Sequence, residues 1–149
     1  MPDFVRKLRS RVGHQLLWLP GATVVIYRTK PRWQVLLGQR ADFGYWDLVA
    51  GMVEPGELPE QTLVREAKEE VGVEIAIERL LRVEVSDVIT YPNGDQCQFL
   101  THVHTARWVA GEPRICDDES LAVGWFDPDD LPSPLHARVS VLIDLARSG

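Results

Sequence analysis

Apolar residues recur along the chain with two different periods, and together they predict strands framed by helices. Apolar runs at 21–27 and 34–40 are typical of strands, and Lys30-Pro31-Arg32 between them predicts the turn of a hairpin. Further strands are expected within 75–88, 96–109 and 121–126, and Pro92-Asn93-Gly94-Asp95 predicts a turn before the second of these segments. Helical spacing appears at 3–15 and 135–146. The pattern favours the α/β (α+β) class, with a mixed β-sheet sandwiched between α-helices.

A further helix is predicted at 59–71, and it places carboxylates beside an apolar stripe. Pro59 suits the first turn, and Gly72 suits the position that follows the last turn. Steps of about 100° per residue place Glu66, Glu69 and Glu70 within one arc of roughly 100°. The neighbouring arc is apolar and consists of Leu63, Val64, Ala67 and Val71. One side of the helix is therefore expected to pack on the core while the adjacent side holds acids.

These three carboxylates repel one another when they stand alone. Like charges three or four residues apart destabilise an isolated helix by about 0.2 to 0.5 kcal/mol per pair. Acids at the edge of a core are also harder to hydrate than acids on a free surface. A solvated acidic face is the ordinary interpretation of such a run, and a bound cation among the carboxylates is the functional one.

Composition and charge narrow the class of protein. With 149 residues and 45% hydrophobic content, the chain is expected to form a single domain, 1–149. It has no apolar run long enough to span a bilayer, no signal-peptide pattern and no zinc-like cysteine pairing, so we expect a cytoplasmic protein without a membrane partner. A net charge of −6 argues against nucleic-acid polymers as partners. A small phosphorylated ligand is compatible with this charge if divalent cations bridge the two sets of negative groups.

Fixed spacings around the acidic helix carry a family resemblance. Gly51 is followed after five residues by Glu57, and after seven more by Arg65-Glu66, an apolar residue, Lys68, Glu69-Glu70, one residue and Gly72. This order resembles the signature of the Nudix hydrolases, including their MutT-like group, over 51–73. Eight residue types at fixed offsets make a chance match very unlikely. Ala50 departs from the usual glycine, so it is expected in an ordinary backbone conformation.

The resemblance implies the Nudix fold and a divalent cation, Mg²⁺ or Mn²⁺, held by residues of this segment. It assigns metal binding to Glu66, Glu69, Glu70 and the Gly51 carbonyl, and a structural ion pair to Glu57 and Arg65. The implied reaction is hydrolysis of a phosphoanhydride bond in a nucleoside diphosphate linked to another group. Glu69 or Glu66 is a candidate general base. Glu119 is a third candidate, because it resembles a further acidic position of the family, and a solvated acidic loop is the alternative for it.

The sequence predicts the identity of the substrate much less specifically than the reaction class. The implied partner is a small nucleotide, such as a nucleoside triphosphate, ADP-ribose or a dinucleoside polyphosphate. Trp33 and Tyr45, near the expected mouth of the site, and Tyr91, which follows Val73 by 18 residues, offer aromatic surfaces for stacking on a base. For Tyr91 the ordinary interpretation is a strand end before a turn. A homodimer is possible, since dimers are frequent in the resembled family.

Two other activities fit the same resemblance. One is a Nudix-fold module that senses a nucleotide without hydrolysing it. The other is an enzyme like the isoprenoid diphosphate isomerases, which rearranges its substrate without cleaving an anhydride. The intact acidic segment favours the hydrolase over both.

Overall fold

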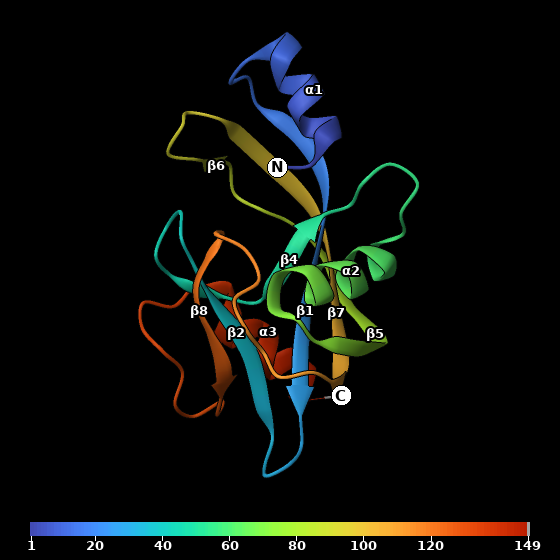
Figure 1. The fold of residues 1–149 in the computed structure, drawn as a ribbon, viewed down its shortest axis with the longest axis vertical. Helices are drawn as coiled ribbons and strands as arrows, with labels where there is room; N and C mark the ends of the chain where they lie inside the picture. The colour runs from blue at the N-terminus through green and yellow to red at the C-terminus, as the bar shows by residue number, and fades with distance from the viewer. Residues whose placement is uncertain (149) are drawn as a thin grey trace.

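The structure is a computed structural model, and it describes residues 1–148 as an α+β sandwich (Figure 1). Its elements in chain order are α1 (Asp3–Val12), β1 (Leu17–Arg28), β2 (Gln34–Arg40), β3 (Trp46–Asp47), β4 (Val49–Met52), α2 (Pro59–Val71), β5 (Glu74–Val85), β6 (Ile89–Thr90), β7 (Gln96–Ala110), β8 (Ser120–Phe126) and α3 (Arg138–Arg147). The predicted mixed sheet between helices is confirmed. Among the described residues, no helix combines the length and the apolar character that crossing a membrane requires.

Strand β1 is the centre of the sheet. It runs parallel to β7 from Leu17 to Tyr27, and its middle residues pair with β4 in the antiparallel sense. Its last two residues pair with the start of β2, as Tyr27 with Val35 and Arg28 with Gln34. On one side of β1, β2 pairs with β3 and with β8. On the other side, β7 pairs with β5 and with β6. The predicted hairpin of β1 and β2 is confirmed, but it is short. Earlier in β1, residues 21–24 pair with β4 and not with β2.

Successive side chains of β1 point to opposite faces of the sheet, and each face is covered by a different helix. Val24 and Ile26 belong to the cluster that includes Leu63 of α2, whereas Val25 between them packs with Leu142 of α3. Figure 1 accordingly shows α2 in front of the sheet and α3 behind it. Complete burial of a leucine such as Leu63 contributes about 1.5 to 3 kcal/mol. The apolar arc of α2 is therefore fixed against the sheet, and this fixes the direction of its acidic arc.

Helix α1 lies over one end of the sheet, where it forms a small separate cluster with β1 and β7. Val5 is fully buried there beside Leu19 and Cys97. The Arg9 guanidinium donates to the Gln96 carbonyl oxygen at 2.7 Å. The same guanidinium lies 3.6 Å from Asp95. The contact is thus partly apolar and partly ionic.

Most element predictions agree with the structure, and the differences have local causes. Strand β1 begins at Leu17, earlier than expected, because its pairing with β7 begins there. The segment 75–88 holds one strand, which ends at Val85. The last helix begins only at Arg138, since Leu135 instead forms a β-bridge with Trp46. Helix α2 spans the predicted residues, and Gly72 caps it with φ 73°.

Candidate functional site

The loop between β4 and α2 begins inside the sheet. Gly51 pairs with Ala22 of β1, and Ala50 pairs with Thr23 in the same register. Ala50 is therefore extended backbone, as the sequence predicted, and no non-glycine residue in the described chain has a positive φ. Further on, the Glu57 amide donates to the Glu54 carbonyl oxygen at 2.9 Å, which closes a turn immediately before the helix. The loop is held at both ends by elements of the core.

Arg65 of α2 joins this loop to the helix. Its Nε atom lies 2.8 Å from Glu57 Oε2, and its Nη2 atom lies 3.1 Å from Glu54 Oε2. Its Nη1 atom contacts Glu66 Oε1 at 2.9 Å and Glu69 Oε2 at 3.2 Å. These contacts raise the pKa of Arg65, with the Glu57 hydrogen bonds as the largest cause. One guanidinium therefore neutralises carboxylates from the loop and from the helix together.

Glu57 is the most strongly stabilised anion of this loop. The Arg65 hydrogen bond lowers the pKa of Glu57 to about 2, against the effect of burial, and the Glu54 amide and the Thr62 hydroxyl assist. The contact from Glu54 to Arg65 was missed from the sequence. Its only sequence signal is a second carboxylate three residues before Glu57.

Gly51 lies directly against the side chain of Glu66. A Cβ atom at Gly51 would stand 2.6 Å from Glu66 Cγ and 2.8 Å from Glu66 Oε1. Real Cβ atoms do not approach other atoms so closely. Glycine is therefore the residue that lets the Glu66 carboxylate reach the backbone of β4.

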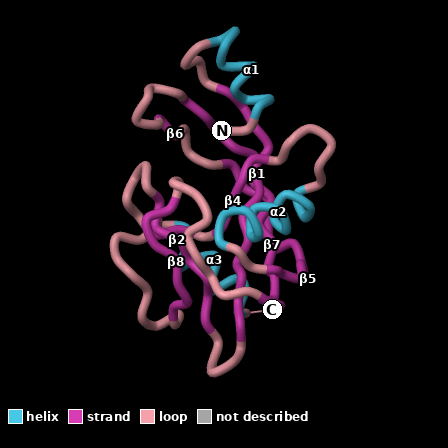
Figure 2. Tube along the Cα trace, in the orientation of Figure 1, coloured by secondary structure: helices cyan, strands magenta, loops and turns pink. Residues whose placement is uncertain are grey.

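A second acidic segment approaches the C-terminal end of α2. The loop 111–119 connects β7 to β8 and, like the other loops, is drawn in pink in Figure 2. It passes beside the C-terminal end of α2 in space. The Arg114 amide donates to the Val71 carbonyl oxygen at 3.0 Å, and the Cys116 amide donates to the Glu70 carbonyl oxygen at 3.4 Å. These bonds place Asp117 and Glu119 near the acids of the helix.

The neighbouring carboxylates change the pKa of Glu70. Burial raises the pKa of Glu70 to about 8, and the charges of Glu66, Asp117 and Glu119 act in the same direction. The pKa of Glu66 is also raised, first by burial, although Arg65 opposes the increase. Asp117 was not among the predicted site residues, because the sequence does not say which acid of 117–119 turns toward the helix.

The remaining predicted acids are more exposed. The Glu69 side chain is 63% exposed and directed to Arg65. The Glu119 side chain is 66% exposed and lies 4.0 Å from the amino group of Met1. Within residues 1–148, no three histidine, cysteine, aspartate or glutamate side chains stand close enough together to hold a metal ion. Glu66 and Glu69 instead share the Arg65 Nη1 atom as their partner.

The chemistry of the donors nevertheless fits a hard cation. Glu66 and Glu70 are carboxylates that burial and mutual repulsion destabilise, and the narrow space at Gly51 admits only a backbone beside Glu66. Oxygen donors of this kind suit Mg²⁺ or Mn²⁺. A cation there would compete with Arg65 for Glu66 and Glu69.

The predicted aromatic residues separate into two places. Tyr45 stacks on Phe43 at 5.6 Å between ring centroids, and Phe43 lies 5.8 Å from Tyr91. Arg40 lies over Phe43 at 5.8 Å, and its positive charge opposes the increase in the pKa of Glu70. The aromatic group of Phe43, Tyr45 and Tyr91 therefore borders the acids. Burial is the largest cause that raises the pKa of Tyr91 to about 12.

Trp33 lies elsewhere. It precedes β2, whereas Tyr45 follows the other end of that strand, and its ring stacks on Tyr27 at 5.8 Å. The expected position of Trp33 near the mouth of the site is therefore wrong. Strand β2 lies between the two residues and places Trp33 at the end opposite Tyr45.

The fold and the site together define a class: an α+β sandwich in which a glycine loop and an acidic helix face a second acidic loop. The family model described as NUDIX domain matches residues 18–145. The chain therefore belongs to the Nudix family, as the spacing of its acidic segment indicated.

Similar proteins are found among characterised sequences and among solved structures. The chain is 38% identical over 117 residues to the NAD-capped RNA hydrolase NudC of Pseudomonas aeruginosa, covering 75% of this chain and 39% of that protein. It is 36% identical over 120 residues to the human 8-oxo-dGDP phosphatase NUDT18, covering 76% of this chain and 34% of that protein. The chain thus spans well under half the length of these relatives.

Among solved structures, the MutT NUDIX hydrolase of Burkholderia pseudomallei has a TM-score of 0.68 at 33% identity, covering 87% of this chain and 98% of that one. An Ap4A hydrolase of C. elegans has a TM-score of 0.64 at 21% identity, covering 86% of this chain and 94% of that one, and supports the fold alone.

Proposed function

We propose that this chain is a divalent-cation-dependent hydrolase of a phosphoanhydride bond in a nucleoside diphosphate linked to another group. The observation that carries the proposal is the contact between two acidic segments: backbone hydrogen bonds hold the loop that contains Asp117 and Glu119 against the end of α2 at Glu70, while Glu66 lies against Gly51. Half-buried carboxylates that repel one another are costly unless a cation joins them. Relatives whose names describe hydrolases and phosphatases support the same reaction class.

Mg²⁺ or Mn²⁺ is the proposed cofactor, and Glu66, Glu69, Glu70 and the Gly51 carbonyl are its proposed ligands. When bound, such an ion supplies neutralisation of the diphosphate charge and activation of water. Arg65, held by Glu54 and Glu57, would orient Glu66 and Glu69 for this task. The tie between loop and helix then serves positioning and takes no part in proton transfer.

Proton transfer is proposed for Glu69, Glu66 or Glu119. Glu69 and Glu119 are the better exposed, so a water molecule and a substrate reach their carboxylates without opening the fold. Glu66 is mostly buried and hydrogen-bonded to Arg65. Replacing each by glutamine and comparing the pH dependence of the rate identifies the base, because only its loss removes the acid limb.

The proposed substrates are small nucleotides and nucleotide conjugates. Tyr45 and Tyr91, which both contact Phe43, offer a stacking surface beside Arg40. The NudC relatives are named for NAD-capped RNA, and the human relative for 8-oxo-dGDP. The net charge of −6 favours the small ligands over a capped RNA chain, and both belong in the substrate panel.

Phosphorus NMR of the products tests the proposal. The protein is incubated with Mg²⁺ or Mn²⁺ and nucleoside triphosphates, 8-oxo-dGDP, ADP-ribose, NAD, dinucleoside polyphosphates or NAD-capped RNA. We expect cleavage of at least one substrate and a loss of at least about a hundredfold in Glu70→Gln. Glu74→Gln is the matched control, because Glu74 is an exposed residue at the start of β5 and should leave the rate unchanged.

Thermal denaturation with each nucleotide, and an isoprenoid diphosphate added to the substrate panel, separate the alternatives. Thermal stabilisation by a nucleotide without any cleavage would favour a sensing module. Rearrangement of an isoprenoid diphosphate with its anhydride intact would favour an isomerase. Turnover that persists fully in Glu70→Gln would contradict the proposed role of the acidic cluster.

A further inference from the structure

Helix α1 lies at the same end of the sheet as the hairpin of β6 and β7 (Figure 1). Its residue Val5 forms a buried cluster with Leu19 and Cys97. Tyr91 packs against this cluster and also lies 5.8 Å from Phe43 between ring centroids. One aromatic ring therefore belongs both to the surface on which α1 packs and to the proposed stacking surface for a base.

Tyr91 begins the turn 91–95, which connects β6 to β7. The Tyr91 amide donates to the Asp95 carbonyl oxygen at 2.9 Å, and the Gly94 amide donates to the Tyr91 carbonyl oxygen at 2.9 Å. Strand β6 consists of two residues, and among residues 1–148 it pairs with the start of β7 and with no other strand. The sheet therefore holds this turn through one short pairing.

Helix α1 holds the same turn through charged groups. Arg9 Nε lies 3.6 Å from the Asp95 carboxylate, and the Arg9 guanidinium donates to the Gln96 carbonyl oxygen at 2.7 Å. His14, which follows the helix, places Nδ1 at 2.7 Å from the same carboxylate. The side chains of Arg9 and Asp95 are 9% and 8% exposed, so solvent screens their attraction little. The position of the turn thus depends on the packing of α1.

The loop at Gly51 is held in a different way. Met52 also packs against the α1 cluster, but it belongs to β4, which pairs with the central strand β1. The Val53 amide adds a hydrogen bond to the Pro20 carbonyl oxygen at 3.0 Å. A displacement of α1 should therefore move Tyr91 more than the loop at Gly51.

We propose that α1 positions the base-binding surface of the site, a role that rests on the proposed function. When α1 is packed on its cluster, it holds Tyr91 where the ring stacks on the base of a nucleotide. Coupling between two binding equilibria is reciprocal, so a base that stacks on Tyr91 also stabilises the packed position of α1. A ligand that carries phosphate without a base leaves α1 unaffected.

Hydrogen exchange of the α1 amides measures this coupling in the wild-type protein. AMP and GMP are the probes with a base, and ribose 5-phosphate carries the same sugar phosphate without one. These three compounds contain no phosphoanhydride bond, so Mg²⁺ is present throughout and no hydrolysis follows. We expect AMP or GMP at saturation to slow exchange in α1 at least about threefold and ribose 5-phosphate to leave it nearly unchanged. Shifts of the Phe43 and Tyr91 amide signals in NMR spectra locate the bound nucleotide.

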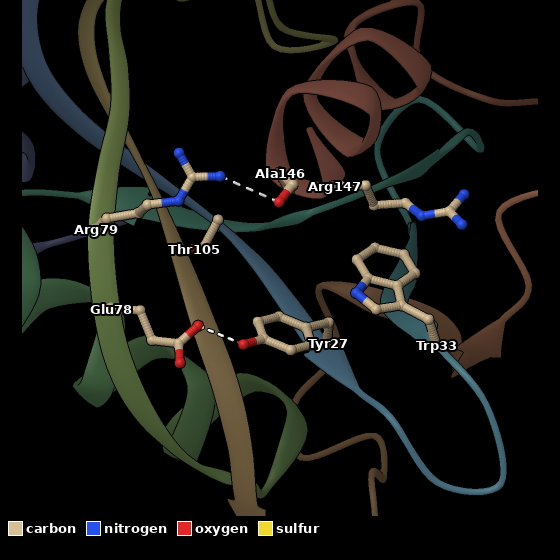
Figure 3. A pocket seen from close by; sticks show the side chains of 7 residues that line it. All are labelled: Tyr27, Trp33, Glu78, Arg79, Thr105, Ala146 and Arg147. Atoms are coloured by element: carbon tan, nitrogen blue, oxygen red, sulfur yellow. Dashed lines mark hydrogen bonds between the residues drawn. The ribbon is translucent and has the colours of Figure 1, made fainter. Parts of the chain in front are cut away.

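An aromatic substitution tests the contact with the base. Tyr91→Leu keeps an apolar side chain against α1 and removes the aromatic face, so it should weaken nucleotide binding at least about fivefold. Tyr27→Leu is the matched control, because Tyr27 stacks on Trp33 beside the cavity shown in Figure 3, at the end of β1 opposite Leu19. It should change the affinity less than about twofold.

A substitution within α1 tests the positioning role. Arg9→Gln weakens the hold on the turn, so it should lower the affinity for AMP or GMP at least about threefold and leave that for ribose 5-phosphate nearly unchanged. It should raise the KM of a cleaved nucleotide by a similar factor with little change in kcat. Arg11→Gln, at an exposed position of the same helix, is the matched control and should alter neither affinity.

Three results would overturn the proposal. They are unchanged exchange in α1 while AMP or GMP is bound, binding of neither nucleotide, and an equal loss of affinity for nucleotide and ribose 5-phosphate in Arg9→Gln. The exchange measurement on the wild type does not depend on the stability of that variant. The proposed hydrolysis is judged separately, by whether Glu70→Gln loses the cleavage seen by phosphorus NMR.

Discussion

At the scale of single residues, the approach of Glu66 to Gly51 decides where the carboxylate can lie. Because a Cβ at position 51 would stand 2.6 Å from Glu66 Cγ, Gly51→Ala must displace the Glu66 side chain. The side chain is flexible, so we expect a change in unfolding free energy below about 1 kcal/mol. Activity should fall by at least about tenfold, since the proposed ligand is moved. Thermal denaturation and product analysis measure the two effects.

Gly124→Ala is the control for this substitution, because a Cβ there meets Phe126 only at the ordinary contact distance of 3.5 Å. It should alter neither stability nor activity by much. Full activity in Gly51→Ala would show that the position of Glu66 is unimportant for the reaction.

At the scale of elements, Arg65 and Glu57 connect the loop after β4 to helix α2. The pKa of Glu57 is lowered from about 4.5 to about 2, so its ion pair stabilises the fold fully above pH 4.5. This stability is lost as the pH falls from 4.5 toward 2, where Glu57 is protonated in the folded state. We therefore expect Glu57→Gln to lower the unfolding free energy by about 2 kcal/mol at pH 7.

Urea denaturation between pH 7 and pH 2 measures this contribution. The difference between the wild type and Glu57→Gln should be constant above pH 5 and shrink below pH 4. Glu74→Gln serves again as the control, with little difference at any pH. A difference that grows toward acid pH would contradict the ion-pair assignment.

At the scale of the whole molecule, the described residues 1–148 form three apolar clusters joined through one sheet. Two of them place α2 and α3 on opposite faces, and the third attaches α1 at one end. Asp95 anchors this third cluster, since its carboxylate is 2.7 Å from His14 Nδ1 and 3.6 Å from Arg9 Nε. We expect Asp95→Asn to raise hydrogen exchange of amides in α1 at least about tenfold while exchange in β1 and β7 changes little.

Asp3→Asn is the matched control, because Asp3 pairs with Arg6 at the exposed start of the same helix. It should leave exchange in α1 nearly unchanged. Equal acceleration throughout the sheet would show that α1 and the central sheet open as one unit. We retain the prediction that 1–149 forms a single domain, and coincident unfolding transitions by fluorescence and circular dichroism would support it.

Several features follow from the sequence by itself because they depend on neighbours along the chain. Helical periodicity predicted a core-facing arc of Leu63, Val64, Ala67 and Val71, and three of these residues are buried. Val64 is 44% exposed, so its predicted place in the core is wrong: it lies at the edge of the arc, where α2 turns toward solvent. Gly72 ended the helix for the local reason that glycine tolerates a positive φ. The fixed spacing of charged and glycine residues was sufficient to predict the family.

Other features were decided only by tertiary structure, because they join segments far apart in the chain. The bonds from Arg114 and Cys116 to the end of α2 bring Asp117 to Glu70, and no local pattern encodes that contact. The route of β2 separates Trp33 from Tyr45 by the length of a strand. Spacing along a helix therefore determined which acids share one side of α2, while the packing of loops against the sheet determined which groups surround each of them.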